Sequence, residues 1–245
     1  MKLGFSTLSL FMKSFDEVCQ IAISNDFEMI EILCEGPYNA EYLLNNRNIL
    51  EPLFSYDLDM NIHGPSVDLN LASLNEGIRK ESIRQIKKTL DLADEIGANF
   101  ITVHPGQIGR REDELRKIAI DYSIDSISKC VDYSSGAKIS VENMPNKFKF
   151  LATKVEELEK ISEESGSFIT IDSGHANTCN STEGFFDMKN IAYFHLHDNN
   201  GIKDEHLVLG EGNLNLNLLK KVDNGIIELN NFDNVLKSKD NILNS

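Results

Sequence analysis

The sequence lacks the features that mark several large classes of protein. No apolar run is long enough to cross the hydrocarbon core of a bilayer, so we expect no membrane partner. The first residues, Met1 to Met12, have neither the cationic region nor the small-residue cleavage site of a secretion signal, and the polar segment Lys13–Glu17 follows at once. We therefore expect a cytoplasmic protein.

Cysteine is sparse, and its spacing excludes one kind of metal site. The four cysteines are scattered along the chain without a CxxC pair: Cys19, Cys34, Cys130 and Cys179. This pattern argues against a zinc site made of thiolates and gives no reason to expect disulfides.

Positive charge is also in deficit. The chain has 24 Lys and Arg against 39 Asp and Glu, and its net charge is −15 at pH 7. Such a surface repels nucleic acid unless one face is locally positive or bound metal ions add positive charge. The composition therefore weighs against a DNA substrate without excluding it.

What the chain does contain is a regular alternation of short apolar runs and longer amphipathic stretches. The predicted strands are Lys2–Ser6, Met29–Leu33, Met60–His63, Phe100–His104, Lys138–Glu142, Phe168–Asp172, Ala192–His195 and Gly225–Leu229. The predicted helices are Phe15–Ser24, Ala40–Phe54, Ile78–Ile96, Glu112–Val131, Thr153–Glu164, Leu214–Val222 and Asn231–Lys237, with a weaker helical turn near Thr182–Asp187.

Eight strand-then-helix units in series predict a parallel sheet of the α/β class. The count of eight and the lack of a Gly-rich phosphate loop after the first strand favour a closed (β/α)8 TIM barrel. An open doubly wound sheet is the alternative. With 245 residues and no Pro-, Gly- or Ser-rich linker, we expect one barrel domain over residues 1–245.

Residues that can bind metal ions or catalyse reactions are concentrated at the ends of the predicted strands. Parallel strands are buried on both faces and should be almost wholly apolar. Six of them are apolar up to a last residue, or one close to it, of metal-ligand type: His63, His104, Glu142, Asp172, His195 and Glu228. In a barrel these positions share one rim, around the mouth where active sites are built.

Three more residues join this set by their spacing. His175 follows Asp172 by three residues, across a tight Ser173–Gly174 turn. Asp204 and His206 stand two apart in a polar loop that leads into Gly210–Asn213 and could fold over the mouth as a lid. Imidazole and carboxylate without thiolate suit zinc, manganese, iron or cobalt better than calcium or magnesium.

Together these motifs resemble the endonuclease IV family (AP endonuclease family 2), within the xylose-isomerase-like TIM barrel superfamily. The resemblance runs from Asn61 to Asn230 and rests on Val103–Gly106, Val141–Asn143, Ile171–Asp172 with His175–Ala176, His195–Leu196 with Asp198, Asp204–His206 and Leu209–Asn213.

The resemblance implies a centre of three zinc ions. His63, His104 and Glu142 would hold one ion, and Glu142 would bridge to a second, also held by Asp172, His195 and Glu228. His175, Asp204 and His206 would hold the third. The implied reaction is hydrolysis of a phosphodiester at abasic sites in DNA, with a hydroxide between two ions as nucleophile. Glu142 and Glu228 are the expected catalytic residues.

Two other functions fit the same residues. Sugar or sugar-phosphate isomerases and epimerases of the superfamily are also similar to this sequence, and they use one ion. Glu142, Asp172, His195 and Glu228 would hold it, with the two glutamates as acid and base. A non-catalytic metal-binding protein is the third alternative, which the size of the ligand set disfavours because a structural zinc site needs only four ligands.

The chain also departs from the endonuclease pattern. Where that family inserts an aromatic side chain into DNA, this sequence has Gly64–Val67, and the loop Glu35–Asn39 is acidic and short. Phosphate contacts usually come from Lys, Arg and backbone amides, so Arg110 and Lys147 are the first candidates for substrate binding, with Arg111 and Lys149 beside them.

His197 stands two residues after His195, on the same face if the strand continues, and is a further candidate for substrate contact. Glu31 and Glu35, at the end of the second strand, receive no role.

Overall fold

The chain folds into a closed barrel of eight parallel strands. The structure is a computed structural model that describes residues 1–179 and 181–244. The strands follow one another around the barrel in sequence order, and β1 pairs with β8 to close it. Their bounds are β1 (Lys2–Ser6), β2 (Met29–Leu33), β3 (Asp59–His63), β4 (Phe100–Val103), β5 (Lys138–Glu142), β6 (Phe168–Asp172), β7 (Ile191–Leu196) and β8 (Asn224–Ile227).

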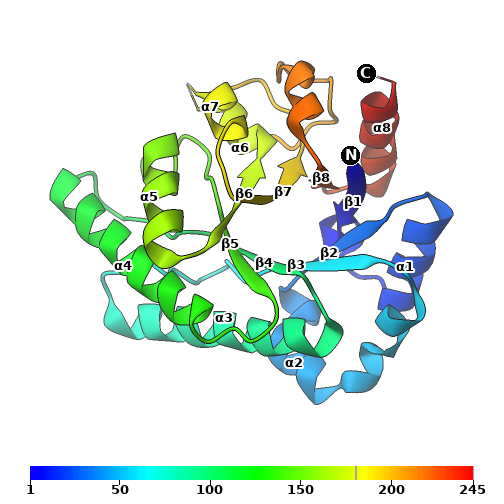
Figure 1. Cartoon of the computed structure of the whole chain (residues 1–245), viewed down its shortest axis with the longest axis horizontal. Coiled ribbons are helices and arrows are strands. Elements are labelled where there is room, and N and C mark those ends of the chain that lie inside the picture. The colour runs from blue at the N-terminus through cyan, green and yellow to red at the C-terminus, as the bar shows by residue number, and fades with distance from the viewer. Residues whose placement is uncertain (180, 245) are drawn as a thin grey trace.

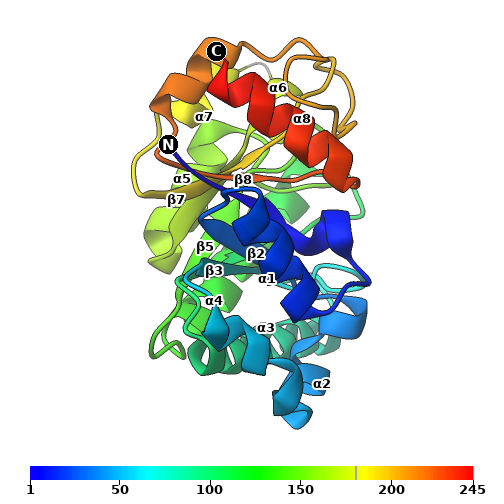
Figure 2. The same ribbon diagram turned by 90° about the vertical axis from the view of Figure 1, so that its right-hand side faces the viewer.

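Helices surround the strands, as Figure 1 shows, and the predicted TIM barrel is confirmed. The α-helices are α1 (Phe15–Ser24), α2 (Ala40–Asn45), α3 (Glu76–Ile96), α4 (Asp113–Val131), α5 (Val155–Ser165), α6 (Ser173–Asn177), α7 (Thr182–Phe186) and α8 (Phe232–Leu243). Short 3-10 helices are η1 (Thr7–Leu10), η2 (Gly36–Tyr38), η3 (Arg47–Ile49), η4 (Glu51–Ser55) and η5 (Leu216–Lys221). Figure 2 shows α8 crossing one side of the barrel near β1 and β8. Within residues 1–179 and 181–244, no helix is both long and apolar enough for a membrane span.

The long helices follow from local sequence signals. The side chain of Ser14 caps α1 by accepting a hydrogen bond from the backbone of Glu17, whose carboxylate in turn accepts one from the Ser14 backbone. α3 presents Ile86, Leu90 and Ala93 to the barrel, and Gly97 ends it in the left-handed conformation that glycine tolerates best.

The helix predicted over Ala40–Phe54 is wrong in its second half. α2 stops at Asn45 because Asn46 leaves helical geometry, and two 3-10 turns follow. Pro52 lacks the N–H that a continuing helix would need, so it starts a new turn instead. The segment predicted as Leu214–Val222 is also a 3-10 helix, η5, and α8 runs six residues beyond its predicted end at Lys237.

The barrel interior is layered from the amino ends of the strands to the carboxyl ends. At the bottom, Met29, Tyr193 and Ile226 form a buried apolar cluster with Phe100 packed against it. Above it lies a layer of hydroxyl groups, and the histidines and carboxylates fill the top. The main apolar core lies between the strands and the surrounding helices. The charged layer is therefore held on a fully packed support.

Candidate metal centre

The carboxyl ends of the strands bring the ligand-type residues together. His63, Glu142 and Asp172 are the last residues of β3, β5 and β6, and His195 is the last but one of β7. His104 and Glu228, which the sequence placed inside strands, directly follow β4 and β8 instead. Because parallel strands keep one register around the barrel, all six side chains reach the same mouth.

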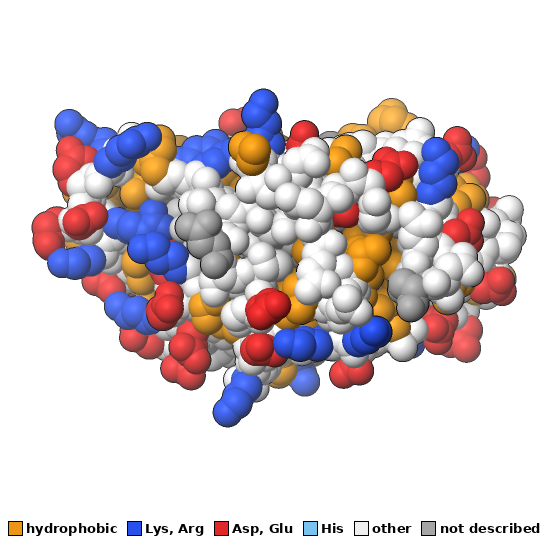
Figure 3. All heavy atoms as spheres, turned by 90° about the horizontal axis from the view of Figure 1, so that it is seen from above, with side chains coloured by type: hydrophobic (Ala, Val, Ile, Leu, Met, Phe, Trp, Pro, Cys, Tyr) orange, Lys and Arg blue, Asp and Glu red, His pale blue; other side chains and the backbone are white. Residues whose placement is uncertain are grey.

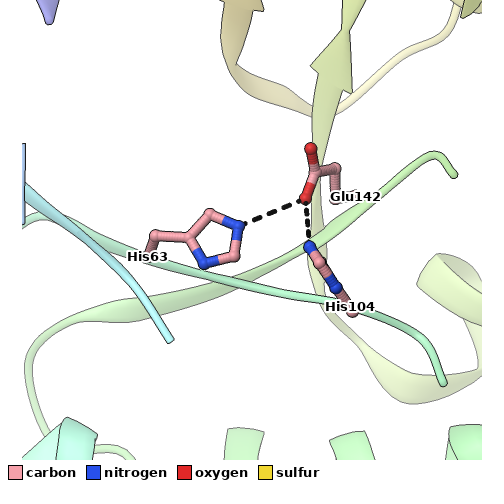
Figure 4. Close-up of side chains that lie close together, drawn as sticks. All are labelled: His63, His104 and Glu142. Carbon is pink, nitrogen blue, oxygen red and sulfur yellow. Dashed lines mark ion pairs between the residues drawn. The ribbon is translucent and has the colours of Figure 1, made fainter. Parts of the chain in front are cut away.

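The first cluster consists of His63, His104 and Glu142. Glu142 Oε2 lies 3.4 Å from His63 Nε2 and 3.0 Å from His104 Nε2. Figure 4 shows both imidazole rings directed at this carboxylate from neighbouring strand ends. The rings stand at 90° to each other, with 5.0 Å between their centroids. His104 is the most exposed of the three, so this cluster opens toward solvent.

The second cluster consists of Glu142, Asp172, His195 and Glu228, whose donor atoms lie within 4.8 Å of one another. His195 Nδ1 is 3.1 Å from Glu142 Oε1 and 3.5 Å from Glu228 Oε2. Glu142 thus turns one oxygen toward each of the first two clusters, which is the arrangement of a bridging carboxylate.

The third cluster consists of His175, His197, Asp204 and His206. His175 Nε2 lies 3.2 Å from Asp204 Oδ2, and His206 Nε2 lies 3.5 Å from Asp204 Oδ1. His197 belongs to two groups of converging donors, one with Asp172 and His175 and the other with Asp204 and His206. All six histidines of the chain therefore lie in this one site.

Backbone carbonyls fix the orientation of three imidazole rings. The Nδ1–H groups of His63, His175 and His206 donate to the carbonyls of Gly64, Asn143 and Glu228 respectively, each over 2.9 Å. A carbonyl can only accept, so these nitrogens carry the protons and the Nε2 atoms face the carboxylates. Histidines that ligate metals are held in this way, with one nitrogen anchored and the other free to coordinate.

Three buried carboxylate oxygens lack a hydrogen-bond partner among the described residues; one is Glu31 Oε1, and the other two belong to these clusters. Glu142 Oε2 and Asp204 Oδ1 are both shielded from solvent, yet neither accepts a hydrogen bond from any residue within the described part of the chain. A buried unpaired oxygen on a charged group costs several kcal/mol unless a cation satisfies it (roughly 1–3 kcal/mol even for a neutral group). The donor set and these oxygens therefore fit divalent cations.

Glu31 is a residue of this site to which the sequence analysis gave no role. Its side chain is fully buried, and its Oε2 accepts hydrogen bonds from Tyr193 over 2.5 Å and from His195 Nε2 over 2.9 Å. Glu31 thereby leaves His195 Nδ1 free to face Glu142 and Glu228. The signal was available, since a glutamate in the middle of an apolar strand such as Met29–Leu33 is buried and needs a partner.

Beneath Glu31 the hydroxyl layer continues the network. Tyr193 and Thr102 share a hydrogen bond of 2.5 Å, and Thr102 also contacts Thr170 and Ser140 at 2.7 and 3.1 Å. Every member comes from a different strand, β4 to β7, so the charged layer rests on a connected polar floor.

The carboxylates and imidazoles shift one another's pKa values strongly. Burial by itself raises the pKa of Glu142, but the charge of His195 and the contact with His104 outweigh it and hold that pKa well below its usual range. The pKa values of Asp172 and Asp204 are also lowered, against burial, by neighbouring histidines. The carboxylates are therefore ionised and ready to bind a cation.

The same contacts act in the opposite direction on the histidines. Burial alone lowers the pKa of His63, but the contact with Glu142 raises it to about 9. Asp172 raises the pKa of His175 to about 10, and Asp204 raises that of His206 to about 9, in both cases against burial. Without a metal, protons balance the carboxylates. A cation would displace those protons on binding.

A cavity of about 450 Å³ opens above the clusters and is the way in for a substrate. Its wall combines site residues (His63, His104, Glu142, His175, Asp204, His206 and Glu228) with apolar side chains such as Leu8, Leu33 and Met144. Lys147 and Lys149 also line it, whereas Arg110 does not and instead pairs with Glu112 at 3.2 Å. Of the predicted substrate-binding residues, the structure brings Lys147 to the cavity and places His197 within the clusters; Arg110 lies outside.

The outer surface shows both signs of charge. On the face in Figure 3, acidic and basic side chains are scattered among uncharged ones, with Lys and Arg more frequent toward one end. A continuous basic stripe, the usual footprint of a nucleic-acid-binding face, is not visible on this face.

The loop after β7 is anchored by a buried carboxylate. Asp198 accepts four backbone hydrogen bonds, from Asn199 and Leu214 on one oxygen and from Gly210 and Gly212 on the other, over 2.8 to 3.0 Å. The Gly210–Asn213 segment, which the sequence suggested as a lid, is thus tied down.

Comparisons with known proteins agree with this architecture. The chain is 34% identical over 262 residues to an uncharacterized protein from Methanocaldococcus jannaschii, covering 98% of this chain and 87% of that protein. It is 24% identical over 232 residues to a probable endonuclease 4 from Thermotoga maritima, covering 82% of this chain and 78% of that one.

A solved structure described as a D-tagatose 3-epimerase-like protein superposes with a TM-score of 0.86 at 34% sequence identity. The superposition covers 100% of this chain and 96% of that one. The xylose isomerase-like TIM barrel family matches residues 19–239, nearly the whole barrel. This protein is therefore a member of the xylose isomerase-like TIM barrel family.

Proposed function

We propose that this protein is a metal-dependent phosphodiester hydrolase that acts at abasic sites in DNA. Three divalent cations, zinc in the first place, would be held by His63, His104, Glu142, Asp172, His175, His195, Asp204, His206 and Glu228. The supporting observation is the set of linked donor groups at one mouth. The second cluster already offers the four donors that a single ion uses, and His63, His104, Asp204 and His206 are donors beyond that set.

Cations bound there would lower the pKa of a bound water toward neutral pH and would place positive charge beside the phosphorus atom. The protein's own residues do the positioning. Glu142 faces the first cluster with Oε2 and the second with Oε1, so it fixes the distance between two cation positions. Glu228 borders both the second cluster and the cavity, where it can contact a substrate oxygen.

The cavity wall suits a charged substrate of limited size. Lys147 and Lys149 are cations on the rim, in a chain whose net charge is −15. They would contact phosphate oxygens and hold the backbone of the substrate over the clusters. The apolar side chains of Leu33 and Met144 line the same cavity and help to exclude bulk water from the reacting bond.

Two measurements on one preparation test this function. Metal analysis of the purified protein should find close to three divalent ions per chain. A duplex with a single abasic site should be cut by the protein, and a chelator should abolish the cutting. One bound ion per chain and an intact duplex would overturn the proposal.

A second candidate is a sugar or sugar-phosphate epimerase with one ion. The second cluster alone is a complete set of four ligands, and a cavity of about 450 Å³ is within the range of small-molecule sites. The similar structure described as D-tagatose 3-epimerase-like supports the same function. Glu142 and Glu228 would then move a proton on and off carbon, and exchange of solvent deuterium into a ketose would identify that reaction.

A further inference from the structure

His197 lies just beyond a strand, and hydrogen bonds fix its backbone on both sides. β7 ends at Leu196, and His197 follows it on the face of His195. Its backbone N–H donates to Ser173 Oγ over 3.0 Å, and the Ser173 hydroxyl donates to the His197 carbonyl over 2.8 Å. This pair of bonds extends the link between β6 and β7 beyond Asp172 and fixes the backbone that carries the ring.

The ring nitrogen Nε2 points at carboxylates. It lies 3.0 Å from Asp172 Oδ1 and 3.6 Å from Asp204 Oδ1. The latter is the buried oxygen that accepts no hydrogen bond from the described residues. The other nitrogen, Nδ1, faces the Asp198 carbonyl at 3.5 Å. His197 thus repeats the pattern of His63, His175 and His206, with one nitrogen toward a carbonyl and one toward the carboxylates.

The surrounding backbone is shaped around this ring. Gly174 packs so closely that a Cβ there would lie 2.0 Å from His197 Cε1, so any other residue would collide with it. The His206 ring also stacks on His197, with 4.0 Å between centroids and 8° between planes. His206 reaches this position from the left-handed conformation, with φ 48°, which is uncommon outside glycine and concentrates at functional sites.

We propose that His197 is a direct metal ligand, through Nε2, at the position formed by His175, Asp204 and His206. This position then has four protein donors, and every histidine of the chain is a ligand. Zinc with four protein ligands is closed to substrate and stabilises structure, while catalytic zinc keeps one position open. The third cation would therefore fasten the loop Asn199–Leu214 to the barrel, and the first position, which has only the three donors His63, His104 and Glu142 in its group, would keep a coordination site open to the substrate.

This inference rests on the proposed metal centre but not on the identity of the substrate. The competing role for His197 is hydrogen-bond donation to Asp172, with no contact to metal. Glutamine separates the two roles, because its amide N–H can replace the donor while its oxygen is a poor ligand for zinc.

The test uses the full chain loaded with cobalt(II). In the NMR spectrum each ligating imidazole contributes one exchangeable N–H signal shifted by the paramagnetic ion. His197→Gln should remove one of these signals and lower the affinity for the third cation by at least about 100-fold. Removal of a residue that only hydrogen-bonds to a ligand lowers metal affinity by roughly 10- to 100-fold. His104→Gln is the matched control, because it should remove one signal and affect the first position alone.

The outcomes separate the two proposals. If the unaltered protein holds three cobalt ions, and His197→Gln keeps all of its shifted signals and all three ions, His197 is a hydrogen-bond donor and this inference is wrong. If the unaltered protein holds only one ion, the proposed centre of three cations fails and this inference fails with it. In either case the signals of the remaining histidines report that the variant is folded.

Discussion

The first and third clusters have similar donors but are built in different ways. His63 and His104 stand at the ends of β3 and β4, and Glu142 ends β5, so strand register alone brings them together. Asp204 and His206 come from a loop that depends on Asp198 and on a left-handed residue. Both clusters border the cavity, but the most exposed ligand of the first, His104, lines it, whereas His197 of the third is fully buried and does not. The comparison indicates that the two clusters can fail separately.

The largest effect is expected from the carboxylate that the first two clusters share. Glu142→Gln removes the charge that faces His63, His104 and His195. We expect loss of two cations and a fall in cutting of the abasic duplex by more than about 100-fold. Asp204→Asn, by contrast, should release only the third cation. Equal metal loss in both variants, measured by metal analysis, would show that the clusters are not independent.

Asp198 tests the support of the third cluster. Asp198→Asn exchanges one acceptor oxygen for an amide that faces backbone N–H groups. The free energy of unfolding should fall on the order of 3 kcal/mol. The third cation should be lost, and proteases should cut within Asn199–Leu214. The matched control is Glu205→Gln in the same loop, where, among the described residues, the carboxylate accepts hydrogen bonds from Asn200 alone. Retention of all three cations in Asp198→Asn would contradict the comparison.

Glu31 tests whether the second cluster depends on the layer below it. Glu31→Gln keeps the shape of the side chain but weakens its hydrogen bond with His195 Nε2. Metal affinity at the second position should fall roughly 10- to 100-fold, and the first and third positions should change less. Glu28→Gln, at an exposed position just before the same strand, is the control. Competition with a coloured chelator measures both variants, and equal affinities would refute the supporting role.

The pH dependence of the free energy of unfolding, measured after a chelator has removed the metal, reports the protons that take the place of the metal. Because the pKa values of His63, His175 and His206 rise on folding to about 9 or 10, their contribution to stability is complete below about 6.5. It is lost as the pH rises through 9 to 10, on the order of a few kcal/mol. Urea unfolding at pH 6, 8 and 10 should show this fall without metal. The metal-loaded protein should lack it, since bound imidazoles are neutral.

The smallest effect is expected at the rim. Lys147→Ala should raise the KM for the abasic duplex roughly fivefold, with a weaker dependence on salt, because Lys147 lines the cavity. Arg110→Ala should leave KM unchanged, since Arg110 is exposed and pairs with Glu112. The reverse result would move the substrate path away from Lys147 and toward the β4–α4 loop.

The pattern of apolar and polar residues along the chain predicted the barrel and much of the site. Short apolar runs located all eight strands with bounds within two residues, because a parallel strand must be apolar. Six of these runs end at or near a ligand-type residue, because the carboxyl end of each strand faces the mouth. The same rule selected His63, Glu142 and Asp172. It failed over Ala40–Phe54, where Asn46 and Pro52 interrupt a helical pattern that the apolar spacing alone suggested.

What the sequence determined by itself is which residues stand at the carboxyl ends of the strands, since neighbouring residues decide secondary structure and its direction. What only the tertiary structure decided is which side chains contact one another across the closed barrel. His195 finds Glu31 across 164 residues, and His197 fits against Gly174 and His206. These contacts arise when the sheet closes and brings distant side chains within hydrogen-bonding distance. The count of eight strands predicted that closure, but no local pattern in the chain encodes which side chains it brings into contact.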